Sequence, residues 1–407
     1  MSTMSADAPV RPDTRRWTPE ALGTGPVSVE PCRSAEYFER ERDAIFKHTW
    51  LNVGRVEEIP NPGDYFVRNI AVVSASVIVV RQQDGTVRAF HNVCSHRANK
   101  VAWDEAGNCK RFTCSFHGWT FGLDGELRGV PDEAQFFDFE KKANGLTPIA
   151  LDEWEGFIFI NVDPRPRNTL AEYLGEFGKG ISGYPFEGLT CYRYKVDMRC
   201  NWKVATNAFQ ESYHVPFVHQ RSVPDSSAGP ENPFAHLVGA SLYPLHSTVS
   251  LYANPRTRLN PVDEAVARYG AGFRKRVVTL TNLPAGVNPL RANQWGFDIN
   301  TVFPNFLMLL WGSGQFLTYN VWPISVNKTI FEVRLYNRQP KTAGEKFAHE
   351  YNRMVLRTAI AEDLATLEQI QPALESGAKP YFLLQDNEIA IRHHHKMVDD
   401  YVYARVS

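Results

Sequence analysis

The stretch NWKVATNAFQESYHVPFVH, at residues 201–219, is the part of the sequence around which the rest of the chain is organised. Read as a helix, it places Asn207, Glu211 and His214 at offsets of four and three residues, so all three point to one face. The pattern therefore predicts a helix that presents an amide, a carboxylate and an imidazole together.

This helix is predicted to end or kink at Pro216, because proline cannot continue the helical hydrogen-bond ladder. A bend there lets His219, which is off that face in an ideal helix, turn back towards His214. Two imidazoles with nearby carboxylates are the donor set of a two-His-one-carboxylate iron(II) site, which keeps coordination positions open for O2. The alternative is that both histidines are packed in an aromatic core with Tyr213 and Phe217, and this stretch alone does not decide between the two.

The composition narrows the class of protein. With 407 residues, 43% of them hydrophobic, the chain is long enough for two or more packed domains. The formal net charge is −1 and the basic residues are scattered, so nothing indicates a surface for nucleic acid. The N-terminus lacks the apolar segment of a secretory signal, and the longest apolar run, at 70–80, is too short to cross a bilayer. We therefore expect a cytoplasmic protein that binds neither nucleic acid nor membranes.

Changes in residue pattern along the chain predict two domains of the α+β class. An arm at 1–35, rich in Pro, Ser, Ala and Asp, is expected to be partly disordered. Residues 36–165 begin with an amphipathic helix and continue as short β runs divided by turn signals such as Asp84-Gly85 and Asp124-Gly125. Residues 166–407 then form a larger domain of helices and strands.

Within this larger domain, strands are expected at 191–200 and between 276 and 337. Residues 222–262 are rich in Pro, Ser and Asn, and we expect them to be mainly loop. A long helix over 341–373 is predicted to stop near Pro372.

A second motif lies in CSHRANKVAWDEAGNCKRFTCSFHGW, at 94–119. It consists of Cys94-x-His96, seventeen residues, and Cys114-x-x-His117, so each half offers one thiolate and one imidazole. Such a set can hold tetrahedral zinc, or a [2Fe–2S] cluster with the cysteines on one iron and the histidines on the other. Zinc fingers normally pair like ligands within a loop. Because each loop here carries one ligand of each kind, the spacing favours a Rieske cluster over zinc.

Together, C-x-H-R…C-x-x-H-G-W and the downstream N-W-K…N-x-x-E-x-Y-H-x4-H give a family resemblance. Over roughly residues 35–400 the chain resembles the large (α) subunit of Rieske non-heme iron oxygenases. The resemblance implies an all-β Rieske [2Fe–2S] domain followed by a catalytic domain of helix-grip type with an antiparallel sheet. By the motif, the cluster ligands would be Cys94, His96, Cys114 and His117, and the mononuclear iron would be held by His214 and His219.

The family's third iron ligand is an aspartate on a late helix, and the candidates here are Glu362 and Asp363 in LRTAIAEDLATLEQIQ. Asp363 falls on the apolar stripe of this helix, whereas Glu362 does not. A carboxylate on a buried stripe needs a metal or a partner. Asp363 is therefore the predicted ligand, and the alternative is a salt-bridged acid at the domain edge.

The family also has an acid four residues after the motif asparagine, hydrogen-bonded across a subunit interface to a cluster histidine. Here Asn207 and Glu211 occupy these positions, and the neighbour would be His117 of another subunit. The resemblance thus implies a homotrimer in which electrons cross between chains, with Asn207 and Glu211 as catalytic residues. Most members have aspartate in place of Glu211, and glutamate is associated with enzymes that oxidise N-alkyl groups.

The resemblance implies a terminal oxygenase that uses O2 and electrons from a separate reductase. No G-x-G-x-x-G follows a strand, so NAD(P)H is expected to act only indirectly, through a ferredoxin and/or a flavin reductase. Two outcomes stay open: monooxygenation of an aromatic substrate, including N- or O-dealkylation, and cis-dihydroxylation of an arene. Glu211, the small Ala208 and the rather short chain favour the first outcome. Whether a small β subunit joins the ring is left open.

Candidates to line a substrate pocket are the aromatic-rich stretch 295–322 together with Phe209, Val215 and Phe217, although ordinary core packing explains each equally well. Two interpretations from other classes remain: an electron carrier, with a cluster but no second iron, and a zinc-stabilised binding protein. The run His-His-His at 393–395 is expected to be a solvated helix face, since consecutive helical residues diverge by about 100° each.

Overall fold

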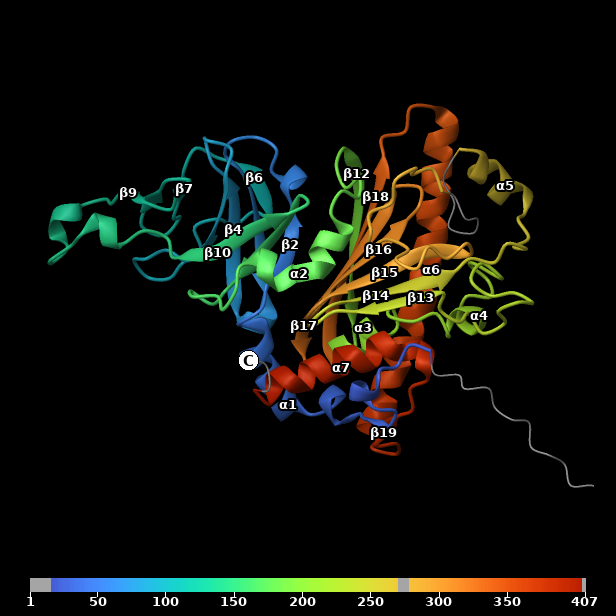
Figure 1. Ribbon diagram of the computed structural model, residues 1–407. Coiled ribbons are helices and arrows are strands. Elements are labelled where there is room, and N and C mark those ends of the chain that lie inside the picture. The colour runs from blue at the N-terminus through green and yellow to red at the C-terminus, as the bar shows by residue number, and fades with distance from the viewer. Residues whose placement is uncertain (1–15, 270–277, 405–407) are drawn as a thin grey trace, which may run out of the picture.

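The computed structural model describes residues 16–269 and 278–404 (Figure 1). It is built on two antiparallel sheets of seven strands, one from each half of the chain. The predicted α+β class is confirmed, with the strands of the first half preceding the helices and strands of the second.

The first sheet has the strand order β2-β11-β10-β5-β4-β3-β6. Its strands are β2 (Leu51–Arg55), β3 (Asp64–Ile70), β4 (Ala75–Arg81), β5 (Val87–His91), β6 (Ala106–Asn108), β10 (Pro148–Trp154) and β11 (Phe157–Asn161). A three-stranded sheet reaches outward from it (Figure 1) and consists of β7 (Phe112–Thr113), β8 (Thr120–Phe121) and β9 (Leu127–Gly129). The two predicted Asp-Gly turns connect β4 to β5 and β8 to β9, and Gly85 and Gly125 both have a φ of 85°, which suits glycine.

The second sheet has the order β12-β18-β17-β16-β15-β14-β13. Its strands are β12 (Leu189–Met198), β13 (Gly239–Leu242), β14 (Ser247–Tyr252), β15 (Trp295–Val302), β16 (Phe306–Trp311), β17 (Phe316–Ser325) and β18 (Lys328–Arg338). The α-helices that accompany it are α2 (Leu170–Ile181), α3 (Trp202–Asn207), α4 (Val215–Val218), α5 (Pro261–Arg268), α6 (Ala343–Glu375) and α7 (Ile389–Val402). No described helix is both long and apolar enough to cross a membrane.

Two buried clusters hold these layers together. Ile360 and Leu367 of α6 share one cluster with Leu309 of β16 and Tyr319 of β17, so the long helix packs directly on the second sheet. Phe177 of α2 belongs to the other cluster, which joins the two sheets through the residues Phe157, Phe159, Phe306 and Phe316. Burial of each such aromatic side chain contributes on the order of 2–3 kcal/mol.

The N-terminal segment partly differs from the expected disordered arm. Residues 1–15 lie outside the described residues, but β1 (Val27–Ser28) pairs with β19 (Tyr381–Phe382) from the far end of the chain. The carboxylate of Asp386 accepts hydrogen bonds from the backbone N–H groups of residues 16–18. Helix α1 (Ala35–Glu41) and the π-helical turn η3 (Arg42–Phe46) then pack against α7. The part of the arm that the structure describes is therefore ordered by contacts with the C-terminal region.

Short 3-10 turns occur between these elements, namely η1 (Glu20–Leu22), η2 (Glu30–Cys32), η4 (Val56–Glu58), η5 (Ala71–Val73), η6 (Glu133–Gln135), η7 (Lys141–Ala143) and η8 (Asp386–Glu388). Two other expectations agree with the structure. Residues 222–262 are mainly loop, although they also contribute β13 and β14 to the second sheet. Helix α6 ends close to the predicted stop and has Pro372 in its last turn.

Candidate functional site

The two Cys/His loops of the first half have the same backbone design. In the first, Cys94 N–H donates to the carbonyl of Asn99 and Ala98 N–H donates to the carbonyl of Cys94. In the second, Cys114 and Gly118 make the corresponding bonds, with the carbonyl of Trp119 in place of that of Asn99. The fourth residue after each cysteine has a positive φ, 59° at Ala98 and 73° at Gly118. Each loop therefore turns back so that its thiol and its imidazole face the other loop.

The two loops bring their histidine rings side by side. The cysteines Cys94 and Cys114 are buried and free, whereas His117 is exposed and its ring lies 4.5 Å from that of His96. His96 stacks on Trp119 with ring centroids 5.0 Å apart.

Two features fit a bound cluster. Nδ1 of His96 is buried without a hydrogen-bond partner among the described residues. Burial disfavours the Cys114 thiolate, but the backbone N–H of Phe116, the side chain of Asn99 and the Cys94 thiol outweigh it and lower the pKa of Cys114. A thiolate and an unpaired imidazole nitrogen beside a second thiol are the donors that a [2Fe–2S] cluster requires.

The stretch from Asn201 to Pro216 is not the single helix that was predicted. Helix α3 ends at Asn207, and α4 begins only at Val215. Between these helices the Glu211 carboxylate accepts the backbone N–H of His214, and the Ser212 hydroxyl donates to the carbonyl of Ala235 in a distant loop. The break brings His214 and His219 towards each other. A kink at Pro216 was expected to have this effect.

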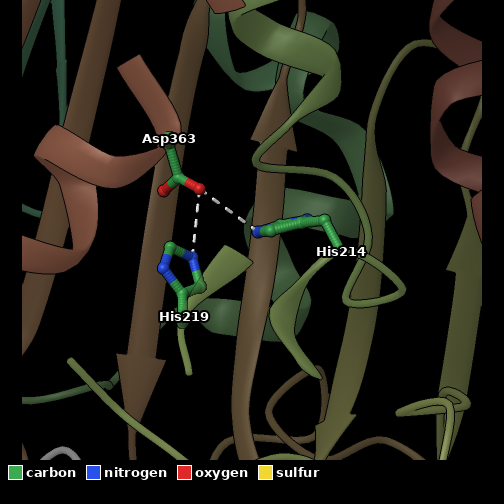
Figure 2. A group of neighbouring side chains, drawn as sticks. All are labelled: His214, His219 and Asp363. Carbon is green, nitrogen blue, oxygen red and sulfur yellow. Dashed lines mark ion pairs between the residues drawn. The ribbon is translucent and has the colours of Figure 1, made fainter. Parts of the chain in front are cut away.

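Figure 2 shows the side chains of His214, His219 and Asp363 converging on one point. Oδ1 of Asp363 lies 3.0 Å from Nε2 of His219 and 3.5 Å from Nε2 of His214. One potential ligand atom from each residue lies within 4.8 Å of the others. Because Asp363 is only 6% exposed, its carboxylate faces these imidazoles rather than solvent. Two imidazoles and one carboxylate in this arrangement fit a mononuclear iron.

Both histidines are fixed from behind by a second carboxylate. Nδ1 of His214 donates to Glu211, and Nδ1 of His219 donates to Oε2 of Glu362 over 2.9 Å. Burial alone would lower the pKa of both imidazoles, but the carboxylates outweigh it, and the pKa of each histidine is raised. The predicted choice of Asp363 over Glu362 agrees with this geometry. The contact of Glu362 with the rear of His219 was missed, since residues 143 positions apart in sequence give no local signal.

A cavity with about 740 Å³ of empty space, part of it open to solvent, is lined in part by His214, His219 and Asp363 and lies between α6 and the second sheet. Its walls are apolar, and Phe297 stacks on Trp311 with ring centroids 4.7 Å apart. Among the described residues, no lysine or arginine lines it. Phe209, Val215 and residues of the stretch 295–322 line the cavity as expected, but Phe217 is 55% exposed and does not.

Asn207 lies on the far side of this centre. Its Nδ2 donates to Nε2 of His395 over 3.1 Å, and it lines a second cavity together with Glu211, His214 and Glu388. The predicted solvated face at 393–395 is therefore wrong, since all three histidines are buried. Nε2 of His394 donates to the carbonyl of Pro304 over 2.8 Å, so α7 faces the core through these imidazoles.

Comparison with known proteins agrees with this arrangement. A family model described as a Rieske [2Fe-2S] domain matches residues 49–147. A second model, described as the catalytic domain of the ring hydroxylating alpha subunit, matches residues 189–404. The two models thus cover the Cys/His loops and the His/Asp centre respectively.

Among individual proteins, the large oxygenase component of the naphthalene 1,2-dioxygenase system of Pseudomonas aeruginosa is 37% identical, over 79% of this chain and 73% of that protein. The carnitine monooxygenase oxygenase subunit of Acinetobacter pittii is 27% identical, over 84% of this chain and 83% of that protein. A solved naphthalene 1,2-dioxygenase from Rhodococcus, bound to indole, has a TM-score of 0.74 at 20% identity and covers 94% of this chain and 95% of its own.

Proposed function

This chain belongs to the Rieske non-heme iron oxygenases as a large oxygenase component, and on that premise we propose that it oxidises an uncharged, apolar, aromatic substrate. The observation that carries the proposal is the apolar cavity whose lining includes His214, His219 and Asp363. Aromatic and aliphatic side chains make up most of its lining, and pockets of this kind select ligands by shape and burial of apolar surface.

The absence of cationic side chains among the described lining residues bears on substrate charge. A substrate with a carboxylate, such as the one named for the carnitine monooxygenase oxygenase subunit, would be buried here without a counter-ion. A buried, unpaired carboxylate is strongly disfavoured. This supports a neutral substrate for the present chain.

The oxygenase carries a Rieske [2Fe–2S] cluster and a mononuclear non-heme iron. We assign the cluster to the residues Cys94, His96, Cys114 and His117, and the mononuclear iron to His214, His219 and Asp363. The bound iron supplies the activation of O2, and the cluster supplies electrons one at a time. Because Nδ1 of both His214 and His219 donates to a carboxylate, each imidazole would keep its proton on Nδ1 and leave Nε2 for the iron.

We also propose that the oxygenase is a homotrimer in which Glu211 links the iron centre to His117 of another subunit. Exposed apolar side chains lie on both surfaces that this contact would use. Phe116 is 55% exposed with its ring 3.9 Å from that of His117, and Tyr213 and Phe217 are exposed beside His214. Apolar surfaces of this kind are common where proteins associate. Asn207 would support the same junction from the second cavity.

The naphthalene and 2,4-dinitrotoluene dioxygenase relatives are named as large oxygenase components of larger systems, which supports a separate electron donor for this chain. We propose a ferredoxin and/or a flavin reductase as the donor, with NAD(P)H consumed only there.

For the reaction, the glutamate at position 211 favours monooxygenation, including N- or O-dealkylation. The higher identity to the naphthalene dioxygenase components, 37% against 27% for the carnitine monooxygenase subunit, favours cis-dihydroxylation as the second candidate.

Turnover with a surrogate ferredoxin and reductase tests the substrate class. Neutral alkyl-substituted aromatics should support product formation, and carboxylated quaternary ammonium compounds should not. Turnover of the charged compounds alone would contradict the proposal.

A further inference from the structure

The imidazole of His219 contacts two neighbouring acids of α6 through its two nitrogens. Nε2 lies 3.0 Å from Oδ1 of Asp363, and Nδ1 lies 2.9 Å from Oε2 of Glu362. Consecutive residues of a helix point about 100° apart. Asp363 therefore faces the centre that the two histidines share, whereas Glu362 reaches the opposite edge of the ring.

Glu362 is itself held in place. Ser222 Oγ donates to the same Oε2 over 2.6 Å, so one carboxylate oxygen receives both the hydroxyl and the imidazole proton. The side chain of Glu362 is 21% exposed, and His219 is its only basic partner among the described residues. A role as an ordinary surface ion pair with lysine or arginine therefore has no support in the described part of the chain.

The other histidine, His214, also contacts a carboxylate through each of its two ring nitrogens. Its Nδ1 donates to Glu211, and its Nε2 faces Asp363. A carboxylate at Nδ1 keeps the proton on that nitrogen and leaves the lone pair of Nε2 for a metal. The site thus contains two pairs of an imidazole and an outer carboxylate, His214 with Glu211 and His219 with Glu362. Asp363 lies next to the Nε2 atoms of both imidazoles.

We propose that Glu362 is a positioning residue of the iron centre, which fixes the tautomer and orientation of His219 with the help of Ser222. The inference rests on the proposed binding of iron by His219. Loss of an outer carboxylate of this kind weakens metal affinity by about 10–100-fold in other proteins. The same range is expected here for Fe(II), with no effect on the Rieske cluster.

The test is the dissociation constant for Fe(II), measured anaerobically by competition with a chromophoric chelator on the protein with its cluster intact. Glu362→Gln keeps the shape of the side chain and removes its charge, so a merely structural role would leave affinity unchanged. We expect weakening near the lower end of the 10–100-fold range for Glu362→Gln and near the upper end for Glu362→Ala. Glu350→Gln, at an exposed pair with Arg353 on the same helix, is the matched control and should bind like wild type.

The variant His219→Ala separates this inference from the proposed site. Loss of Fe(II) binding in His219→Ala with wild-type affinity in both Glu362 variants would overturn the role of Glu362 alone. Wild-type affinity in His219→Ala would overturn the proposed iron site itself. The visible absorbance of the cluster reports whether each variant is folded. A further variant, Ser222→Ala, should weaken Fe(II) binding less than Glu362→Ala does.

Discussion

Oδ1 of Asp363 lies 3.0 Å from Nε2 of His219, although the two residues come from α6 and from the end of α4. The same oxygen faces Nε2 of His214 at 3.5 Å. One carboxylate on the helix that packs across the second sheet therefore lies beside both imidazoles in the lining of an apolar cavity. This arrangement places the proposed iron ligands next to the proposed substrate cavity.

Replacement of His214 by alanine is expected to abolish oxygenation, because only one imidazole and one carboxylate would remain for the mononuclear iron. The Rieske cluster lies in the other domain and should keep its visible spectrum. Metal analysis should find the cluster iron and its sulfide at wild-type levels and the additional iron missing. Loss of the cluster colour would mean that the two sites are not separate.

Replacement of Glu211 by glutamine is expected to slow turnover by at least about ten-fold, since it removes the charge next to Nδ1 of His214 at the proposed junction between subunits. With Fe(II) in excess, both metal centres should stay occupied. Stopped-flow measurement of cluster reoxidation during a single turnover locates the effect. Unchanged reoxidation would remove Glu211 from the electron path.

Mixed oligomers test the crossing of electrons between chains. A Cys114→Ser chain lacks the cluster and a His214→Ala chain lacks the iron, so each homo-oligomer should be inactive. In a ring whose clusters serve a neighbouring chain, random mixing in equal amounts should restore about a quarter of wild-type activity. If the mixture stays inactive although the chains co-assemble, electrons do not cross between subunits.

Ala359 lines the cavity from α6, and its replacement by phenylalanine should fill part of the space for substrate. We expect kcat/KM for two-ring substrates to fall by roughly 10–100-fold and that for one-ring substrates to fall less. Iron content should not change. Thr358→Phe, at the exposed neighbouring position, is the control and should behave like wild type. Equal losses for both substrate sizes would argue that the substrate binds elsewhere.

The free energy of unfolding should decrease as the pH is lowered, because the protein contains buried neutral histidines. Burial lowers the pKa of His246 from 6.5 to about 4, and its Nδ1 accepts the backbone N–H of Phe303. The unfolded chain therefore binds a proton first as the pH falls below 6.5. The contribution of His246 is complete above that pH and is lost as the pH falls towards 4.

At about pH 5.5 the loss from this one residue is about 1.4 kcal/mol. Thermal unfolding followed from about pH 7.5 to about pH 5.5 should show the decline, with a smaller slope in His246→Gln. An equal slope in both proteins would show that His246 does not contribute.

Local patterns carried the information for the proposed metal ligands. Each Cys/His loop closes through hydrogen bonds within six residues, so its spacing carries the information. Asp363 was predicted because a buried stripe on one helix is also a local feature. The break between α3 and α4 is accompanied by a hydrogen bond from Ser212 to the carbonyl of Ala235, 23 positions away, which no periodicity records.

Tertiary pairing explains the other differences. Strand β14 has the polar composition of a loop, but Thr248 bonds to Asn300 and Ser250 to Asp298 on β15, so these side chains are buried with their partners. The histidines at 393–395 were likewise predicted to face solvent because their partners are distant in the sequence. His395 finds Asn207, which lies 188 positions away in sequence. Composition alone assigns such residues to solvent because it contains no information on distant partners.

Monooxygenation is tested most directly by mass spectrometry of products formed under isotopically labelled O2, with a surrogate reductase and neutral N- or O-alkyl aromatic substrates. We expect one labelled oxygen in the product, or loss of an alkyl group as a labelled or exchanged aldehyde, and no product from His214→Ala. Two labelled oxygens in a dihydrodiol would contradict monooxygenation and establish cis-dihydroxylation. Consumption of NAD(P)H without label in any product would contradict the assignment of the cavity as the site of oxygenation.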